Sequence, residues 1–148
     1  MDGNRFLKIT STAFTPFLRD LGFSIEKPSI SGRYYQVRYI GQFHIVTIAY
    51  EPGDNAFFVM VSTGKNNQLL DIDDRSKAPR LTDLNKRYMK MVTIEERLTN
   101  EAFFKTIEPQ DKEENLLLKA AKELRLVLPK HMQSVGWVEA RSPTNTAI

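Results

Sequence analysis

The chain has 148 residues, of which 41% are hydrophobic and 26% are charged, a balance typical of one folded domain and not of a disordered chain. It contains no cysteine, which excludes disulfide bonds, thiolate metal ligands and a cysteine nucleophile, and which fits a reducing compartment. The net charge of +3 is small and its basic excess is scattered over residues 1–50, so charge alone does not indicate a nucleic-acid-binding protein.

The N-terminal segment contains one predicted helix. Apolar residues recur there at the spacing of a single helix face: Phe14, Phe17, Leu18 and Leu21. Thr12 or Thr15 can cap its start, and Gly22 suits the left-handed conformation that ends many helices. The pattern therefore predicts a short helix that ends at Gly22, with Phe23 folding back onto it.

The next segment changes to the alternating pattern of β-strands. Residues 34–40, 43–50 and 56–63 are rich in β-branched and aromatic side chains. Gly41-Gln42 has the composition of a two-residue type II′ hairpin turn, and residues 52–55 form a second turn signal. These signals predict an antiparallel meander of three strands.

The middle strand of this meander is apolar on both faces. Phe43, Ile45, Thr47 and Ala49 point one way, and His44, Val46, Ile48 and Tyr50 point the other way. Either both faces are covered inside the fold, or one of them carries a partner site.

Two helices are predicted towards the C-terminus. Thr93 and Glu96 have the spacing of a capping box, which starts a helix that runs to about residue 107. Pro109 suits the first turn of a last helix, which Pro129 is expected to end. The last helix has an apolar stripe formed by Leu117, Ala121, Leu124 and Leu128. The expected fold is one α+β domain over residues 1–148, with a frayed tail at 141–148: an N-terminal helix, a three-stranded antiparallel meander, then two C-terminal helices.

An acidic run between the meander and the C-terminal helices is the first candidate for chemistry. It contains Asp71, Asp73 and Asp74, whose carboxylates can bind Mg²⁺ or Ca²⁺. Basic residues lie close by in the sequence, and they can pair with these carboxylates in a solvated loop. A small metal-assisted hydrolase that uses these aspartates, with His44 as its base, is one alternative that the sequence leaves open.

No catalytic or cofactor-binding motif is present in the chain. It lacks a nucleophile elbow, a phosphate-binding glycine-rich loop, a zinc-protease helix motif and a dinucleotide fingerprint. His44 and His131 are its two histidines, and nothing in their spacing pairs either with a nucleophile. We therefore expect no cofactor and no bound metal, and a binding role is favoured over an enzymatic one.

The predicted hairpin is rich in aromatic residues with arginines between them. Such a surface can stack single-stranded nucleic acid, which is a second alternative, but it also suits a protein interface. Tyr34, Arg38, His44 and Tyr50 are the strand positions least suited to a dry core. Together with Asp71, Asp73 and Asp74 they are the predicted partner-binding residues.

The N-terminus shows no uninterrupted apolar segment followed by a small-residue cleavage site, and no apolar stretch is long enough to span a bilayer. The expected location is the cytoplasm, without membrane binding.

Part of the sequence resembles a known class of proteins. The likeness is carried by Phe14-Thr15-Pro16-Phe17-Leu18, Leu21-Gly22-Phe23, Tyr39-Ile40-Gly41 and Val46-Thr47-Ile48-Ala49-Tyr50-Glu51-Pro52. These segments resemble small immunity-type proteins encoded beside bacterial toxins, in which a helix that ends in a Gly-Phe step precedes a meander. The resemblance covers about the first 60 residues. It implies a cytoplasmic protein that binds a cognate toxin and occludes it, and it assigns no functional residue. The leading hypothesis is thus a non-enzymatic interaction domain that binds one partner protein.

Overall fold

The computed structural model describes residues 1–65, 68–69 and 77–144. Its helices are α1 (Gly3–Ala13), α2 (Thr15–Asp20), α3 (Leu81–Tyr88), the 3₁₀ turn η1 (Met89–Met91), α4 (Ile94–Phe104) and α5 (Lys112–Thr144). Its strands are β1 (Ser24–Ile25), β2 (Ser29–Ile30), β3 (Tyr35–Ile40), β4 (His44–Glu51), β5 (Ala56–Lys65) and β6 (Gln68–Leu69). None of the helices in the described part of the chain is both long and apolar enough to cross a membrane.

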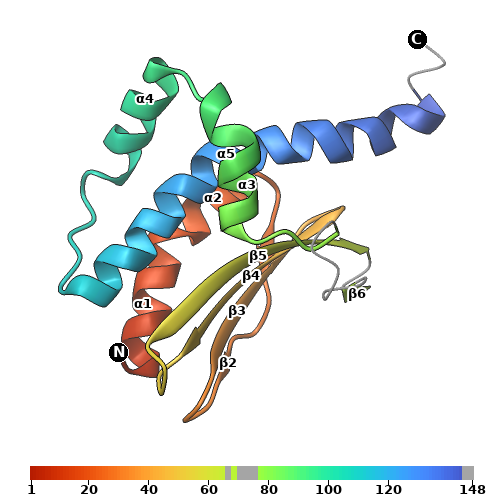
Figure 1. Ribbon diagram of the computed structural model, residues 1–148. Helices are drawn as coiled ribbons and strands as arrows, with labels where there is room; N and C mark the ends of the chain where they lie inside the picture. Colours follow the sequence, from red (N-terminus) through yellow and green to blue (C-terminus); the bar gives the residue numbers. More distant parts are fainter. Residues whose placement is uncertain (66–67, 70–76, 145–148) are drawn as a thin grey trace.

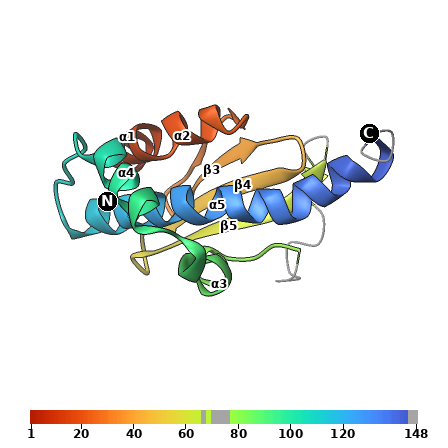
Figure 2. The same cartoon turned by 90° about the horizontal axis from the view of Figure 1, so that it is seen from above.

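The fold has two layers, a sheet and a layer of helices. Strands β3, β4 and β5 pair antiparallel in chain order, with β1 and β2 on the outer edge of β3 and β6 at the far end of β5. Figure 2 shows α5 lying along the sheet, with α1 and α2 on one side of it and α3 on the other. Helix α4 packs on α5 and stands away from the sheet (Figure 1). The α+β class with an antiparallel sheet is confirmed.

The finer arrangement differs from the predicted one. The single N-terminal helix is two helices, the two C-terminal helices are three, and the sheet has three short strands besides the meander. Helix α1 begins at an Asp2 cap and buries Phe6, Ile9, Thr10 and Ala13. The hydroxyl groups of its threonines donate hydrogen bonds to carbonyls of the preceding turn; the Thr10 hydroxyl, for example, donates to the Phe6 carbonyl at 2.8 Å. Threonines usually favour caps and turns, and their presence in this segment explains why the sequence pattern did not predict α1.

Helix α2 ends as predicted, but it does not start as predicted. Gly22 has a φ of +93°, and the Phe23 N–H donates to the Leu18 carbonyl at 2.9 Å, which closes the last turn. Phe14 occupies the N-cap without a side-chain hydrogen bond, so neither predicted threonine caps the helix. The Thr15 hydroxyl instead shares a 2.8 Å hydrogen bond with the Tyr39 hydroxyl and ties α2 to the sheet.

The hairpin turn between β3 and β4 lies one residue later than predicted. The Gly41 N–H donates to the His44 carbonyl at 2.8 Å, which leaves Gln42 and Phe43 as the central residues. Neither has a positive φ, so the predicted type II′ turn is wrong. Gly41 is required for space instead, because a Cβ there would lie 2.8 Å from the Phe23 ring.

Strand β4 forms the centre of the fold and is buried from His44 to Tyr50 on both faces. This agrees with the first of the two readings of its apolar pattern. Its helix-facing side chains Val46 and Ile48 join one core with the α5 stripe, whose four predicted residues are all fully buried.

Helix α5 does not end at Pro129 but continues to Thr144. Proline removes one backbone donor from a helix and crowds the carbonyl four residues earlier, here that of Arg125. The helix changes direction near its middle (Figure 1), as expected for an interior proline. Packing of the flanking stripe on the sheet outweighs the local penalty, which is why the sequence-based end of the helix was wrong.

Candidate functional site

Two of the predicted partner-binding residues lie inside the fold. His44 is 3% exposed and Tyr50 is 1% exposed, both on the face of β4 that meets the helices. The Tyr50 hydroxyl donates to Glu113 and lies 2.9 Å from the Asn55 side-chain oxygen, and burial together with Glu113 raises the pKa of Tyr50 to about 12. These positions hold the two layers together, so their burial argues against direct contact with a partner.

The other two hairpin residues are half-buried on the opposite face of the sheet. The Tyr34 hydroxyl donates to Gln36 at 2.9 Å. Arg38 Nη1 lies 3.0 Å from Glu26 Oε2, and this ion pair fixes the Arg38 side chain across the short strand β1. Both side chains therefore have intramolecular partners, and their role in binding stays a prediction.

The acidic run Asp71, Asp73 and Asp74 lies outside the described residues. Among the residues that are described, no group of three histidine, aspartate or glutamate side chains is placed to hold a metal ion.

The two histidines, far apart in the sequence, meet in the folded chain. The ring centroids of His44 and His131 are 5.4 Å apart, and His131 Nδ1 shares a 3.3 Å hydrogen bond with the Tyr88 hydroxyl. That hydroxyl also bonds Ser134 at 2.9 Å. Burial, followed by the nearby charges of His44 and Arg87, lowers the pKa of His131 to about 4. Burial likewise lowers the pKa of His44.

No carboxylate bonds either imidazole within the described part of the chain, and His44 Nε2 is buried without a partner. Within the described residues the pair therefore has no orienting carboxylate of the kind that a general base would use, and the aspartates of the predicted hydrolase lie outside those residues. The hairpin tyrosines Tyr35, Tyr39 and Tyr50 are likewise in the core and are not free to stack on bases.

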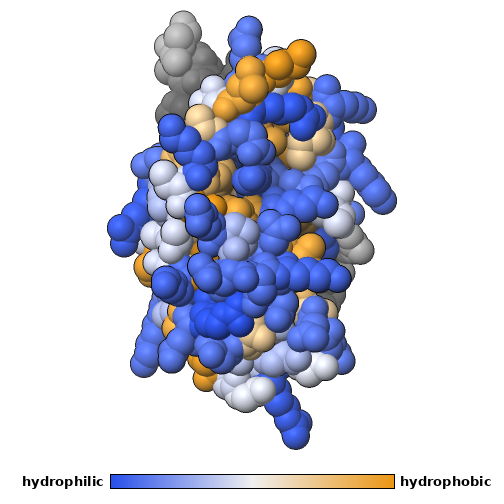
Figure 3. All heavy atoms as spheres, turned by 90° about the vertical axis from the view of Figure 1, so that its left-hand side faces the viewer, coloured by the Kyte–Doolittle hydropathy of each residue, from blue (hydrophilic) through white to orange (hydrophobic). Residues whose placement is uncertain are grey.

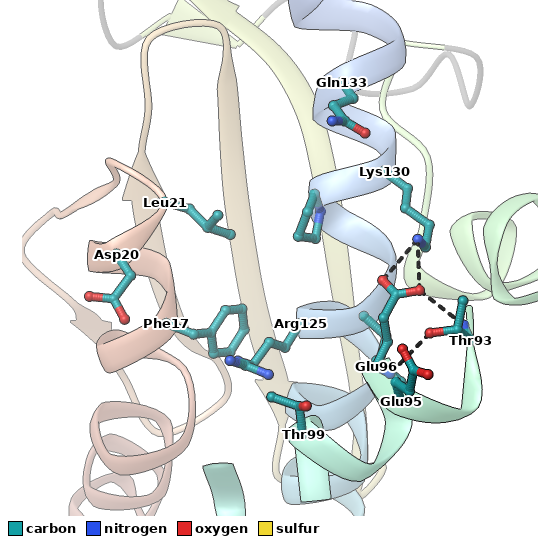
Figure 4. A pocket seen from close by; sticks show the side chains of 12 residues that line it. Phe17, Asp20, Leu21, Thr93, Glu95, Glu96, Thr99, Arg125, Lys130 and Gln133 are labelled. Carbon is teal, nitrogen blue, oxygen red and sulfur yellow. Dashed lines mark hydrogen bonds and ion pairs between the residues drawn. The ribbon is translucent and has the colours of Figure 1, made fainter. Parts of the chain in front are cut away.

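The largest hollow that we describe is a cleft of about 600 Å³ between α2, α4 and α5. Figure 4 shows Arg125 from α5 between Phe17 of α2 and Thr99 of α4. Lys130 Nζ lies 3.0 Å from Glu96 Oε2 and closes one end of the cleft. The Thr93 N–H bonds Glu96, and together with Lys130 this lowers the pKa of the Glu96 carboxyl.

Helix α4 is attached to the fold by polar contacts with α5 and by the Phe104 ring, which is buried in the core. Buried Asn100 donates to the Lys122 carbonyl at 3.0 Å and accepts from Arg125 at 2.9 Å. Arg125 also lies over the Phe103 ring at 4.0 Å, and burial lowers the pKa of its guanidinium. The predicted capping box of Thr93 and Glu96 is present and starts the helix. Polar clamps thus hold α4 in place while most of its circumference stays uncovered.

The uncovered side of α4 carries large apolar side chains. Met91 is 57% exposed, Ile94 is 77% exposed and Leu98 is 66% exposed, more than any other large hydrophobic residue in the described part of the chain. Ile94 and Leu98 are four residues apart and lie on one side of α4, and Met91 belongs to the 3₁₀ turn that precedes the helix. Figure 3 shows this side of the molecule as mostly hydrophilic, with an apolar patch near its top, at the height of α4 in Figure 1. A contiguous group is informative where a single exposed residue is not.

Four basic residues lie close to this apolar group along the chain, in the last turn of α3, in the 3₁₀ turn and in α4: Lys86, Arg87, Lys90 and Arg97. All four are exposed, and in the described chain none pairs with a carboxylate. The Arg97 guanidinium reaches the Met89 carbonyl at 3.4 Å, which places it beside the 3₁₀ turn. We call the seven residues of both groups the α4 surface.

The sequence contained a signal for this surface. Ile94 and Leu98 are an i, i+4 apolar pair, which normally indicates the buried side of a helix. The buried side of α4 is set by contacts with other elements, such as the hydrogen bonds of Asn100 with α5. These contacts join residues far apart in the sequence. The capping box predicted the helix but could not identify its exposed face.

We compared the chain with models of protein families, with curated proteins and with solved structures, and none of the three comparisons finds a match. Geometry and charge are therefore the evidence for function.

Proposed function

We propose that this chain is a non-enzymatic interaction domain that binds one partner protein through the α4 surface. The observation that carries this proposal is the exposure of Ile94 and Leu98 on one side of α4 and of Met91 in the 3₁₀ turn before it. Large apolar side chains exposed together cost free energy in the unbound protein, and covering them with a partner recovers it.

The charges around the apolar group indicate the kind of partner. The four basic side chains of the α4 surface lack carboxylate partners in the described chain, whereas Glu96 and Glu101 of α4 are paired with lysines of α5. Asp20 and Glu95 are the other acidic residues in the wall of the cleft. A partner with an apolar centre and an acidic rim matches this pattern, and its acidic rim would speed association at low salt.

The immunity-type resemblance gives a specific version of this proposal. A toxin that presents such an acidic, partly apolar surface would be occluded when the α4 surface covers it. The resembling segments lie in or next to α2, β3 and β4 and not in α4, so they would supply the scaffold and α4 the recognition.

The test compares paired variants in binding to a purified partner. Ile94→Asp with Leu98→Asp removes the apolar centre, and Ile25→Asp, at a strand residue 41% exposed, is the matched control. Proteins retained by the unmodified chain from the lysate of its host are identified, and each is purified for binary titration. We expect a one-to-one complex that the double variant weakens about a hundredfold or more, while the control leaves it unchanged.

A partner that binds the unmodified protein, the Ile94→Asp/Leu98→Asp variant and the Ile25→Asp control equally well would overturn the assignment of the α4 surface. If nothing but nucleic acid is retained, with an affinity that falls steeply with salt, the interaction proposal fails and the four basic residues bind phosphates instead.

A further inference from the structure

The cleft between α2, α4 and α5 contains an arginine that is fixed in place without a carboxylate. Arg125 Nη1 donates to Asn100 Oδ1 at 2.9 Å, and the guanidinium lies over the Phe103 ring at 4.0 Å. Asn100 is 2% exposed and donates to the Lys122 carbonyl, which fixes its orientation. In the described part of the chain, no carboxylate forms an ion pair with Arg125. A guanidinium held in this way is preorganised to bind an anion.

Partial burial makes the unpaired charge of Arg125 costly. Burial lowers the pKa of the guanidinium, and the nearby charge of Asp20 opposes this effect. A cation that has lost part of its hydration gains free energy from an anion that replaces the lost water. Guanidinium and carboxylate groups match in geometry and form two parallel hydrogen bonds. A carboxylate is therefore the expected ligand on the Arg125 side of the cleft.

Asp20 supplies the opposite charge on the facing wall of the cleft. It is the last residue of α2, where the carbonyl end of a helix disfavours a negative charge. Its side chain is exposed and has no ion pair with a described residue. Figure 4 shows Asp20 on α2 and Arg125 on α5, with Phe17 drawn between them. The two charges influence each other but are too far apart for a direct ion pair, so a ligand can connect them.

The other acidic residues of the cleft are already compensated. Glu96 pairs with Lys130 at 3.0 Å. Glu95 lies in the first turn of α4, where the N-terminal end of a helix favours a negative charge. Among the described residues, this cleft of about 600 Å³ therefore combines an unpaired cation, an unpaired anion and an apolar lining. The apolar lining consists of Phe17, Leu21, Leu126 and Pro129.

We propose that this cleft binds a free α-amino acid with an apolar side chain. The carboxylate of the amino acid pairs with Arg125, and its ammonium group pairs with Asp20. Its side chain packs on Leu21 and Pro129. An internal residue of a peptide does not fit, because its amino and carboxyl groups are joined in peptide bonds and carry no charge. The site uses no residue of the α4 surface, so its failure would leave the proposed function unaffected.

The first experiment compares three ligands of nearly equal size on the full chain labelled with ¹⁵N. L-leucine carries both charges, leucinamide lacks the carboxylate, and isocaproate lacks the ammonium group. We expect leucine to shift the amides of Leu21, Thr99 and Lys130, with a Kd of about 10 µM to 1 mM for a ligand of this size. Each analogue should bind about tenfold more weakly or worse, because it leaves one charge of the cleft without its partner.

Variants of the protein test the same two charges. Asp20→Asn removes the charge that binds the ammonium group, and the matched control Asp54→Asn removes a charge in the turn between β4 and β5, which does not line the cleft. We expect Asp20→Asn to weaken leucine binding about tenfold without weakening isocaproate binding, and Asp54→Asn to change neither. Arg125→Lys keeps the charge but loses the planar pair of donors, so it should weaken both ligands.

Leucinamide or isocaproate that binds as tightly as leucine would overturn the amino-acid site. Unchanged leucine binding by Asp20→Asn would overturn it as well. If Arg125→Lys does not fold, the ligand series and Asp20→Asn still decide the question, because they leave Arg125 and its contacts intact. Absence of shifts at several millimolar leucine would refute the site altogether.

Discussion

Helices α1 and α4 have the same length, eleven residues, and both pack on α5, yet they are held in opposite ways. Helix α1 buries a continuous row: Phe6, Ile9, Thr10 and Ala13. Helix α4 buries only Asn100 and Phe104, and its large aliphatic residues face outwards. Asn100 and Phe104 attach α4 to the rest of the fold, so its exposed aliphatic side chains are not needed for that attachment. The difference therefore identifies α4 as the helix with residues free for binding.

The largest expected effect comes from the α1 side. Phe6 is fully buried, with ring centroids 5.6 Å from Tyr35 and 6.2 Å from Tyr50. Phe6→Ala should lower the free energy of unfolding by about 3–5 kcal/mol, because it removes a buried ring and leaves a cavity. Urea denaturation measures this. A loss below about 1 kcal/mol would mean that α1 is no more firmly anchored than α4.

The next largest effect is a loss of stability at acidic pH, which we expect from His131 in the C-terminal half of α5. The pKa of His131 falls from 6.5 to about 4 on folding, so the unfolded chain binds the proton first as pH drops. Stability should be full above pH 6.5 and decrease by about 2 kcal/mol on going from pH 7 to pH 5. His131→Gln should remove this part of the slope in denaturation curves measured across that range. An unchanged slope would contradict the burial of a neutral His131.

The polar clamp of α4 should have a smaller effect. Asn100→Ala removes two buried hydrogen bonds, to Lys122 and Arg125, and should cost about 1–2 kcal/mol. Hydrogen exchange should accelerate in α4 and not in α1. Equal acceleration in both helices would show that α4 does not open independently.

The smallest effect is expected at the exposed side of α4. Leu98→Ser should change the free energy of unfolding by no more than about 0.5 kcal/mol, since Leu98 packs on little else. The same denaturation assay checks this. A loss above about 1.5 kcal/mol would place Leu98 in the fold and not in a binding surface.

The parts of the fold that the sequence predicted are local. Gly22 ended α2, the capping box of Thr93 and Glu96 began α4, and alternation located the three long strands. The features that it missed are tertiary. Strands β1 and β2 have two residues each and exist only because β3 offers an edge, and α5 passes Pro129 because its stripe packs on the sheet.

The candidate sites show the same division. The sequence marked His44 and Tyr50 as polar residues on a strand, but it could not tell that the helices cover that face of β4. The α4 surface depends on which face of that helix the rest of the chain leaves uncovered. No residue pattern within one element contains that information.

The packing of the first helix on the last one also sets an order of folding. Arg5 Nη2 lies 2.9 Å from Glu114 Oε2, which is 109 residues further along the chain. During synthesis the meander is complete long before α5 leaves the ribosome, so the helix-facing side of the sheet lacks its cover for about half of translation. Closure of a loop this long is slow compared with the formation of a hairpin. The strands therefore form first, and docking of α5 completes the core in a late, cooperative step.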